Sequence, residues 1–506
     1  MNGRLKKIIL VILAAVLVSG SGFFQKSLNH DRDTLGLTHV EGLTNAPPVL
    51  AFTTVALGGF RGLISNLLWT RANQLQEDDK FFEMAQLSDW ITKLEPHFSQ
   101  VWAHEAWNMA YNISVKFKDY PDRWRWVQNG IELLRDQGLR YNPDDVLIHR
   151  ELAWFFQHKM GANLDDASMY YKTQWEKEMT DLFGGKNPDF EALIHPRTPE
   201  EINRAQILRE KYKMDPEFMK QVDDEYGPLE WRLPEASAIY WAAQGLKRAA
   251  ENPTKVSPTD DLIVLRRVIY QCMQLTWQRG RIVDNPFSSG MDFGPNLDMI
   301  PKVNDTYLKM YGEEKDLAQR DSIVKAHRNF LRQAIYSLYV YNRTADAAKW
   351  FKYLGQKYPD KTIIDGDFNS YPRNVTLDQY AVACVQSDIN DMSPDRLRTV
   401  LEGLLMTSYM SLVIDQDDRA EGLQRLAKQA RDSYESKIPA ARRDPLRVAS
   451  VREISRDVLG RLLNPTNGLP PQAQAILRTK LNMPAEKPSV GVTNQVEMET
   501  RGTNAP

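Results

Sequence analysis

The sequence predicts an all-α fold: a helix-pair solenoid behind an N-terminal transmembrane or signal-anchor helix. From Phe81 onward, apolar residues recur at the spacing of helix faces. Prolines close several of these apolar segments, and the first 25 residues combine a basic start with an uncharged run. No stretch alternates cleanly between apolar and polar residues, so we expect no sheet.

The N-terminal segment begins with three basic residues, Arg4, Lys6 and Lys7, and residues 8–25 carry no charge. Such a segment inserts with its basic end in the cytoplasm, so the bulk of the chain should lie on the periplasmic or extracytoplasmic side. Two alternatives remain: cleavage near Gly20, or a retained single-pass anchor in the cytoplasmic (inner) membrane. Phe23 and Phe24 extend the apolar run, and we favour the retained anchor.

A second apolar stretch, residues 49–69, holds Arg61 near its middle, which makes a second membrane span costly. It is either an amphipathic helix lying on the bilayer or the first core helix of the folded part, and we favour the core helix. Its membrane contact stays open.

Composition and proline spacing divide the chain into segments. They are an anchor (1–25), a linker (26–48), an amphipathic helix with helix pairs (49–183), helices with two loop inserts (184–302), C-terminal helical repeats (303–483) and a disordered tail (484–506). The inserts are the turn-rich runs 184–234 and 284–302. Loops of that length are usually functional or disordered, and their aromatic residues favour ordered loops folded onto the helices.

Helix starts are marked by hydroxyl caps followed by proline. Thr198-Pro199 with Glu201 forms a capping box, and Ser257 and Ser393 each precede a proline in the same way. These signals place helices at 199, 258 and 394.

Three prolines, Pro96, Pro143 and Pro359, each end an apolar helix, and the residues around them resemble the tetratricopeptide repeat. The matching positions are Trp102, Ala106, Leu152, Ala153, Phe156, Ala347 and Phe351. Pro96 and Pro143 are 47 residues apart, so the intervening unit should carry about 13 extra residues, placed around 116–124. The resemblance covers 80–165 and 328–360, although Ile335 stands where a small residue is expected.

The whole chain also resembles membrane-anchored bacterial helical-repeat proteins. The segments that carry this likeness are Leu57-Gly58-Gly59-Phe60-Arg61-Gly62, Leu67-Leu68-Trp69 and Ala106-Trp107-Asn108-Met109-Ala110-Tyr111-Asn112. This resemblance implies no reaction.

In the repeat register, the first helix of each unit faces the concave surface, which predicts a ligand-binding groove. The register places these residues there: Trp107, Tyr111, Arg150, Trp154, His158, Arg332 and Tyr336. Flat rings give contact area, and a guanidinium group binds a carboxylate through two hydrogen bonds. An extended peptide therefore suits such a face. The alternative is that these rings only pack between neighbouring units.

Other chemistry finds little support in the sequence. Lysine and arginine number 64 against 66 acidic residues, which argues against nucleic acid, and no nucleotide-binding glycine loop, cofactor motif or catalytic triad motif occurs. His158 with Asp165 and Asp166 fits no metal-ligand spacing and is better explained as a helix end. Cys272 and Cys384 are expected to be two buried thiols, with a single bridge between them as the alternative.

We therefore predict a non-enzymatic, membrane-tethered scaffold that binds a protein or peptide partner. One alternative is an envelope enzyme acting on cell-wall glycan, for which Glu105, Glu151 and Glu230 are the candidate acids. The other is a permanent structural subunit of a membrane complex. The sequence predicts no metal and no cofactor in any of the three.

Overall fold

The computed structural model describes residues 61–484, except 163, 186, 253–258, 284–290, 386–393 and 438–447, and a few single positions between 20 and 31. The predicted anchor, the linker and the C-terminal tail thus lie almost wholly outside the described residues. Within the described part, no helix is both long and apolar enough to cross a bilayer.

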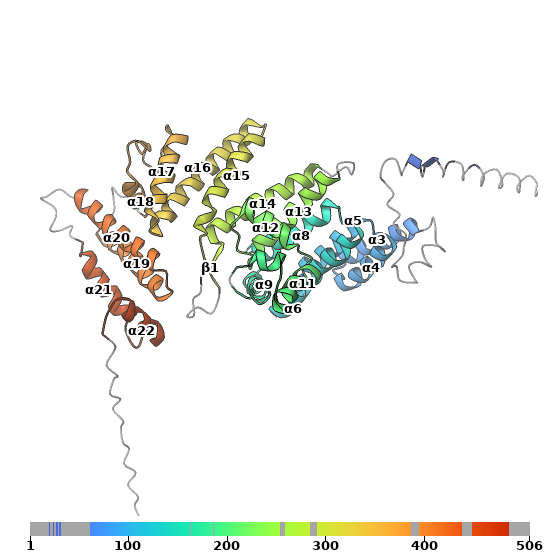
Figure 1. Ribbon diagram of the computed structural model, residues 1–506, viewed down its shortest axis with the longest axis horizontal. Helices are drawn as coiled ribbons and strands as arrows, with labels where there is room; N and C mark the ends of the chain where they lie inside the picture. Colours follow the sequence, from blue (N-terminus) through green and yellow to red (C-terminus); the bar gives the residue numbers. More distant parts are fainter. Residues whose placement is uncertain are drawn as a thin grey trace, which may run out of the picture. The chain divides into compact units, whose positions relative to one another are not determined.

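The chain divides into two compact units. The first comprises residues up to 282 together with 293–308, and the second comprises 283–292 and the chain from 309 onward. Both are mostly helical (Figure 1), as the sequence predicts.

The first unit contains most of the helices. They are α3 (Arg61–Glu77), α4 (Phe81–Leu94), α5 (Ser99–Trp107), the π-helix η2 (Asn108–Ile113), the 3₁₀-helix η3 (Ser114–Lys116), α6 (Tyr120–Glu132), the π-helix η4 (Leu133–Gly138), α7 (Leu139–Tyr141), α8 (Val146–Trp154), the π-helix η5 (Phe155–Gly161), α9 (Ser168–Phe183), α10 (Phe190–Ile194), α11 (Pro199–Glu210), α12 (Pro216–Tyr226), α13 (Pro234–Glu251), α14 (Thr259–Arg279) and the 3₁₀-helix η6 (Leu297–Met299).

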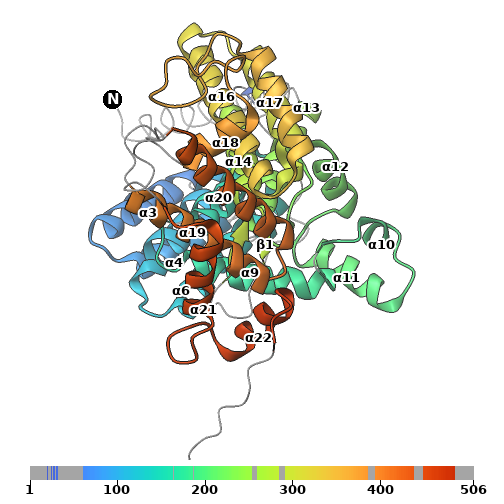
Figure 2. The same cartoon turned by 90° about the vertical axis from the view of Figure 1, so that its left-hand side faces the viewer.

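Helix α15 (Ile300–Glu313) crosses from the first unit into the second. The second unit then contains α16 (Leu317–Val340), α17 (Thr344–Lys357), α18 (Leu377–Val385), α19 (Pro394–Val413), α20 (Asp417–Lys437), α21 (Val451–Leu462) and α22 (Pro471–Lys480). Helices α16 and α17 pack side by side in both views (Figures 1 and 2), and α19 packs along α20.

The structure shows no long loop around 116–124, where the sequence places the extra residues. Only residues 117–119 separate η3 from α6, and the extra residues lengthen the two helices instead. Part of this length is π-helical, with i to i+5 hydrogen bonding, which takes more residues per turn than an α-helix. The connection between these helices is therefore short although Pro96 and Pro143 are far apart.

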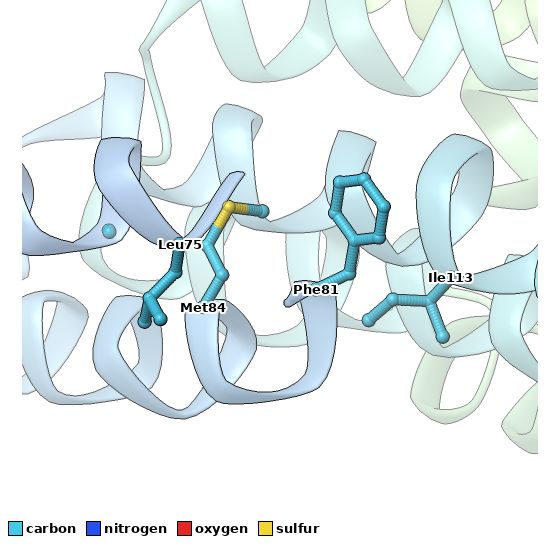
Figure 3. Close-up of a cluster of buried hydrophobic side chains, with 5 residues drawn as sticks. Leu75, Phe81, Met84 and Ile113 are labelled. Carbon is cyan, nitrogen blue, oxygen red and sulfur yellow. The ribbon is translucent and has the colours of Figure 1, made fainter. Parts of the chain in front are cut away.

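The second apolar stretch is described only from Arg61, where helix α3 begins. Helix α3 packs against α4, where Ala72 and Leu75 join Phe81, Met84 and Ile113 in a cluster of buried side chains (Figure 3). Residues 49–60 lie outside the described part of the chain. The cluster residues of α3 follow residue 69, and Leu67 within the stretch is 63% exposed, so the core helix at 49–69 stays a prediction.

Cap chemistry explains where several helices begin. At α11, the Thr198 hydroxyl accepts the Glu201 N–H while the Glu201 carboxylate accepts the Thr198 N–H, which confirms the predicted capping box. Ser450 and Glu453 repeat this arrangement at α21. Pro394 begins α19, whereas the caps at Ser257 and Ser393 lie outside the described residues.

The two loop inserts differ from simple loops. The first contains α10, α11 and α12, and its final run folds inward: Trp231 is buried and donates its indole N–H to Asp223 at 2.9 Å. At the second, β1 (Arg281–Val283) precedes the insert and pairs in a two-stranded sheet with β2 (Asp292–Gly294), which lies within it. The expectation of no sheet is therefore wrong here, because segments of three residues are too short to show a period of two.

Candidate functional site

Four of the predicted groove residues form one continuous cluster in the first unit, which we call the aromatic ladder: Trp107, Tyr111, Trp154 and His158. Trp107 stacks on Tyr111 with ring centroids 5.1 Å apart, and Trp154 stacks on His158 at 4.7 Å. The Tyr111 hydroxyl and His158 Nδ1 lie 3.1 Å apart and join the two stacks by a hydrogen bond. Two neighbouring helices thus contribute equivalent pairs.

The local helix geometry places these rings. Trp107 is the last residue of α5 and Trp154 the last of α8, and a π-helix comes directly after both. The second ring of each pair lies four residues further on, so it stands on the same face one turn away. π-helical turns are rare and often occur at functional sites, and here two of them hold corresponding positions.

The ladder lies at the surface but is supported from beneath. Trp107 is 40% exposed, and the other three members are half-buried. The Tyr111 ring meets the buried Phe155 edge-on at 5.6 Å, and the ammonium group of Lys159 lies 5.0 Å from the Tyr111 centroid. The rings are therefore held in place while part of their surface still meets water.

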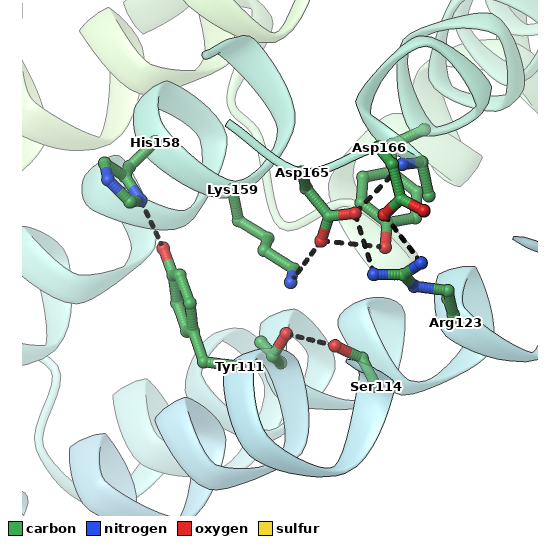
Figure 4. A network of polar contacts seen from close by, with 10 residues as sticks. Tyr111, Ser114, Arg123, His158, Lys159, Asp165 and Asp166 are labelled. Carbon is green, nitrogen blue, oxygen red and sulfur yellow. Dashed lines mark hydrogen bonds and ion pairs between the residues drawn. The ribbon is translucent and has the colours of Figure 1, made fainter. Parts of the chain in front are cut away.

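Next to Tyr111 and His158 lies a buried ion network centred on Asp165 (Figure 4). Its carboxylate accepts hydrogen bonds from Lys159 Nζ at 2.6 Å, Arg123 Nη2 at 3.0 Å and the Ala167 N–H at 2.9 Å. Burial alone raises the pKa of Asp165, but the bonds from Lys159 and Ala167 and the charges of Lys159 and Arg123 lower this pKa below its usual range. The network ties α6 to η5 and to the turn after η5.

The two polar members of the ladder are uncharged at neutral pH. Burial, with the nearby charge of Lys159, lowers the pKa of His158 from its ordinary value. Burial, with the negative charges of Glu151 and Asp165, holds the pKa of Tyr111 well above its usual range. The exposed surface of the ladder is thus aromatic and without formal charge.

His158, Asp165 and Asp166 contact other side chains of the chain. His158 turns to Tyr111, while Asp165 and Asp166 both bind Arg123. Among the residues that the structure describes, no group of three metal-ligating side chains is placed to hold an ion.

The two predicted arginines are engaged by carboxylates of the chain itself. Arg150 binds Glu151 on its own helix and Asp261 on α14. Arg332 lies in the second unit, where both terminal nitrogens bind the Asp365 carboxylate at 3.0 and 2.9 Å, and Tyr336 stands one turn further along α16. The structure therefore brings together four of the seven predicted residues, with Arg150 one turn from Trp154.

Sequence reasoning missed the residues that support the ladder. Lys159 and Arg123 resemble ordinary surface charges in the sequence, yet Lys159 is 4% exposed and Arg123 is 8% exposed. Arg123 and Asp165 are 42 residues apart in the chain, so no local pattern pairs them. The one available signal was an Asp-Asp turn directly after the helix that carries His158.

The three candidate catalytic glutamates occupy structural positions. Glu151 binds Arg150, and both oxygens of Glu230 bind Arg232 at 2.8 Å. Glu105 is 1% exposed, and neither of its oxygens has a hydrogen-bond partner among the described residues. Burial, with the charge of Asp89, raises the pKa of Glu105 to about 8 although the nearby Ser88 hydroxyl lowers it.

The Glu105→Gln variant is expected to be more stable than the natural chain at alkaline pH. Because the folded-state pKa of Glu105 lies above the unfolded value of 4.5, the natural chain loses stability as pH rises from about 4.5 to about 8 and levels off above that. Glutamine has the same shape and no charge to bury, so we expect a gain of about 2 kcal/mol at about pH 8. Denaturant unfolding at about pH 5 and about pH 8 measures it.

The gain should shrink towards zero at about pH 5, where Glu105 is protonated in the folded state. Glu83→Gln, an exposed substitution on α4, is the control and should change little at either pH. Equal effects of Glu105→Gln at both pH values would contradict a buried neutral carboxyl.

The described part of the chain is thus a helical protein whose first unit presents an aromatic cluster on paired helices. Comparison with protein-family models, curated proteins and solved structures finds no match for the chain.

Both cysteines are free. Cys272 is buried as predicted, but Cys384 is exposed, so the prediction of two buried thiols is wrong for Cys384 because the helix face that carries it is not covered by described residues.

Proposed function

We propose that this protein is a scaffold that binds a protein or peptide partner through the aromatic ladder. The observation that carries the proposal is the half-exposed pair of ring stacks on two neighbouring helices, fixed by the Tyr111–His158 bond and by the ion network next to them. Rigid, partly exposed aromatic side chains are typical of binding hot spots because they give contact area at little entropic cost.

The chemistry of the ladder favours apolar or aromatic side chains of an extended partner segment. Tyr111 and His158 carry no formal charge, and Trp107 presents the largest exposed ring. Arg150 is occupied by Glu151 and Asp261, so it positions α8 against α14 rather than serving as a free fork for a carboxylate. We further propose that the paired helices around the ladder, and α16 with α17, are tetratricopeptide-like units.

The proposal includes a membrane tether. Its support is the sequence alone: three basic residues followed by the uncharged run 8–25, which would leave the helical units on the outer side of the cytoplasmic membrane. Fractionation of cells that express the full chain tests this part separately, since an anchored protein stays with the membrane after a high-salt wash.

Mild-detergent purification of the full chain, followed by cross-linking and mass spectrometry, tests the scaffold proposal. We expect a recurring partner whose cross-links fall within residues 100–160. Cross-links only at 184–234 or 284–302 would move the binding site to the inserts. A partner that never exchanges would favour a permanent structural subunit. In a separate assay, release of fragments when the protein is incubated with isolated cell wall would favour the envelope enzyme.

A further inference from the structure

The second unit contains a cavity, and none of its lining residues belongs to the aromatic ladder. It has a volume of about 420 Å³ and lies between α16, α18 and the segment 358–376 that joins α17 to α18. Its lining combines a cation and a carboxylate with rings and apolar groups, among them Arg332, Tyr336, Ile363, Asp365, Tyr380 and Cys384. A concave site of this size suits a small ligand or a single amino-acid side chain.

Arg332 supplies the positive charge of the cavity lining. Its side chain is 17% exposed, and the buried Tyr380 donates its hydroxyl to the Arg332 carbonyl oxygen at 2.9 Å, which ties α18 to α16. This bond holds the backbone at Arg332, and the guanidinium group can bind a carboxylate through two parallel hydrogen bonds. Tyr336, one turn further along α16, presents a ring beside it.

The current partner of Arg332 is exposed to solvent. The Asp365 side chain is 88% exposed, although it makes both bonds to Arg332. Asp365 belongs to a turn next to Gly366, whose φ of 80° lies in the left-handed region that favours glycine. Because the Asp365 carboxylate lies largely in solvent, a second carboxylate can replace it on Arg332 at little cost.

We propose that this cavity binds an apolar molecule or chain end that carries a carboxylate. The ligand carboxylate takes the place of Asp365 on Arg332, and its apolar part lies against Tyr336 and Ile363. Without a ligand, the Asp365 carboxylate binds Arg332, so anions that bind Arg332 more weakly than Asp365 does are excluded. A free monocarboxylic acid and the C-terminal residue of a peptide share this chemistry, and the site is independent of the proposed partner-binding face.

The thiol of Cys384 allows ligand binding in the cavity to be measured. It is exposed and lines the cavity, whereas Cys272 is fully buried, so a thiol reagent should modify Cys384 selectively in the folded full-length chain. We expect 3-phenylpropionate to protect Cys384, and its neutral amide, 3-phenylpropionamide, to give no protection. Hexapeptides that end in phenylalanine, with a free or an amidated C-terminus, distinguish a peptide end from a free acid.

Two variants make the test specific to Arg332. Arg332→Gln should weaken protection by 3-phenylpropionate at least about tenfold. Asp365→Asn should strengthen protection several-fold, because the competing carboxylate is gone. Arg373→Gln is the matched control, since Arg373 pairs with exposed Asp360 outside the cavity lining, and should leave protection unchanged.

Three results would each overturn the proposal: equal protection by the acid and the amide, full protection in Arg332→Gln, or no protection by either the acid or the free-ended peptide. If Arg332→Gln unfolds, Asp365→Asn decides the matter alone, because a decrease or no change in protection contradicts the exchange of carboxylates.

Discussion

Replacing Asp165 with asparagine is expected to lower the free energy of unfolding by about 3–5 kcal/mol. Asparagine keeps the size of the side chain but removes the charge that Lys159 and Arg123 face. Lys159 is 4% exposed and its ammonium group makes its 2.6 Å bond to this carboxylate. The variant leaves a buried cation without its counter-charge, and chemical denaturation at neutral pH measures the loss.

Asp166→Asn is the matched control for this prediction. Asp166 binds the same arginine, at 2.7 Å from Nη1, but its side chain is 69% exposed, so its loss should cost about 0–1 kcal/mol. Equal effects of the two substitutions would show that burial of the network does not matter.

The same network predicts a pH dependence. Because the folded-state pKa of Asp165 is lowered, its contribution is present above the unfolded value of 3.8 and is lost as pH falls through the folded value. The natural chain should therefore lose stability below about pH 4 more steeply than Asp165→Asn does. A parallel acid dependence of the two proteins would contradict the lowered pKa.

Replacing Trp107 and Trp154 together with alanine is expected to reduce partner capture by at least about 100-fold, equivalent to about 3 kcal/mol. The substitutions remove one ring from each stack and leave Tyr111 and His158 without their stacking partners. Stability should fall by only about 1–3 kcal/mol, because Trp107 is 40% exposed and Trp154 is half-buried. Quantitative recovery of the partner with each variant in detergent measures capture.

Trp90→Ala is the control for the tryptophan pair. Trp90 is a half-exposed tryptophan on α4 in the same unit, 48% exposed and outside the ladder. It should leave capture unchanged. Loss of capture in this control, or normal capture by the double variant with the fold intact, would contradict the role of the ladder.

Local signals in the sequence were sufficient for the helical class and for several helix starts. The capping box at Thr198 depends on residues three apart, and such patterns are visible without a structure. The repeat register also placed Trp107 and Trp154 at equivalent positions, and the structure puts each at the end of an α-helix. The π-helical turn after each tryptophan has no sequence signature, so it could not be predicted.

The contacts of the charged residues depended on distant partners. In the sequence, Arg150 resembled an arginine free to bind a ligand carboxylate. Its actual partner, Asp261, is 111 residues away, so no local pattern pairs them. Lys159 and Arg123 are buried only because η5, α6 and the turn at Asp165 come together. Pairing across such separations is fixed by tertiary packing, which is why the supporting network could not be predicted from the sequence.

A photoreactive benzoylphenylalanine in place of Trp107 tests the central claim most directly. In cells that express the full chain, irradiation should join residue 107 to one recurring partner, and the same residue at position 90 should give no such product. The two positions have similar exposure, 40% and 48%, so accessibility alone predicts equal labelling. No product from position 107, or the same product from both positions, would contradict a partner-binding aromatic ladder.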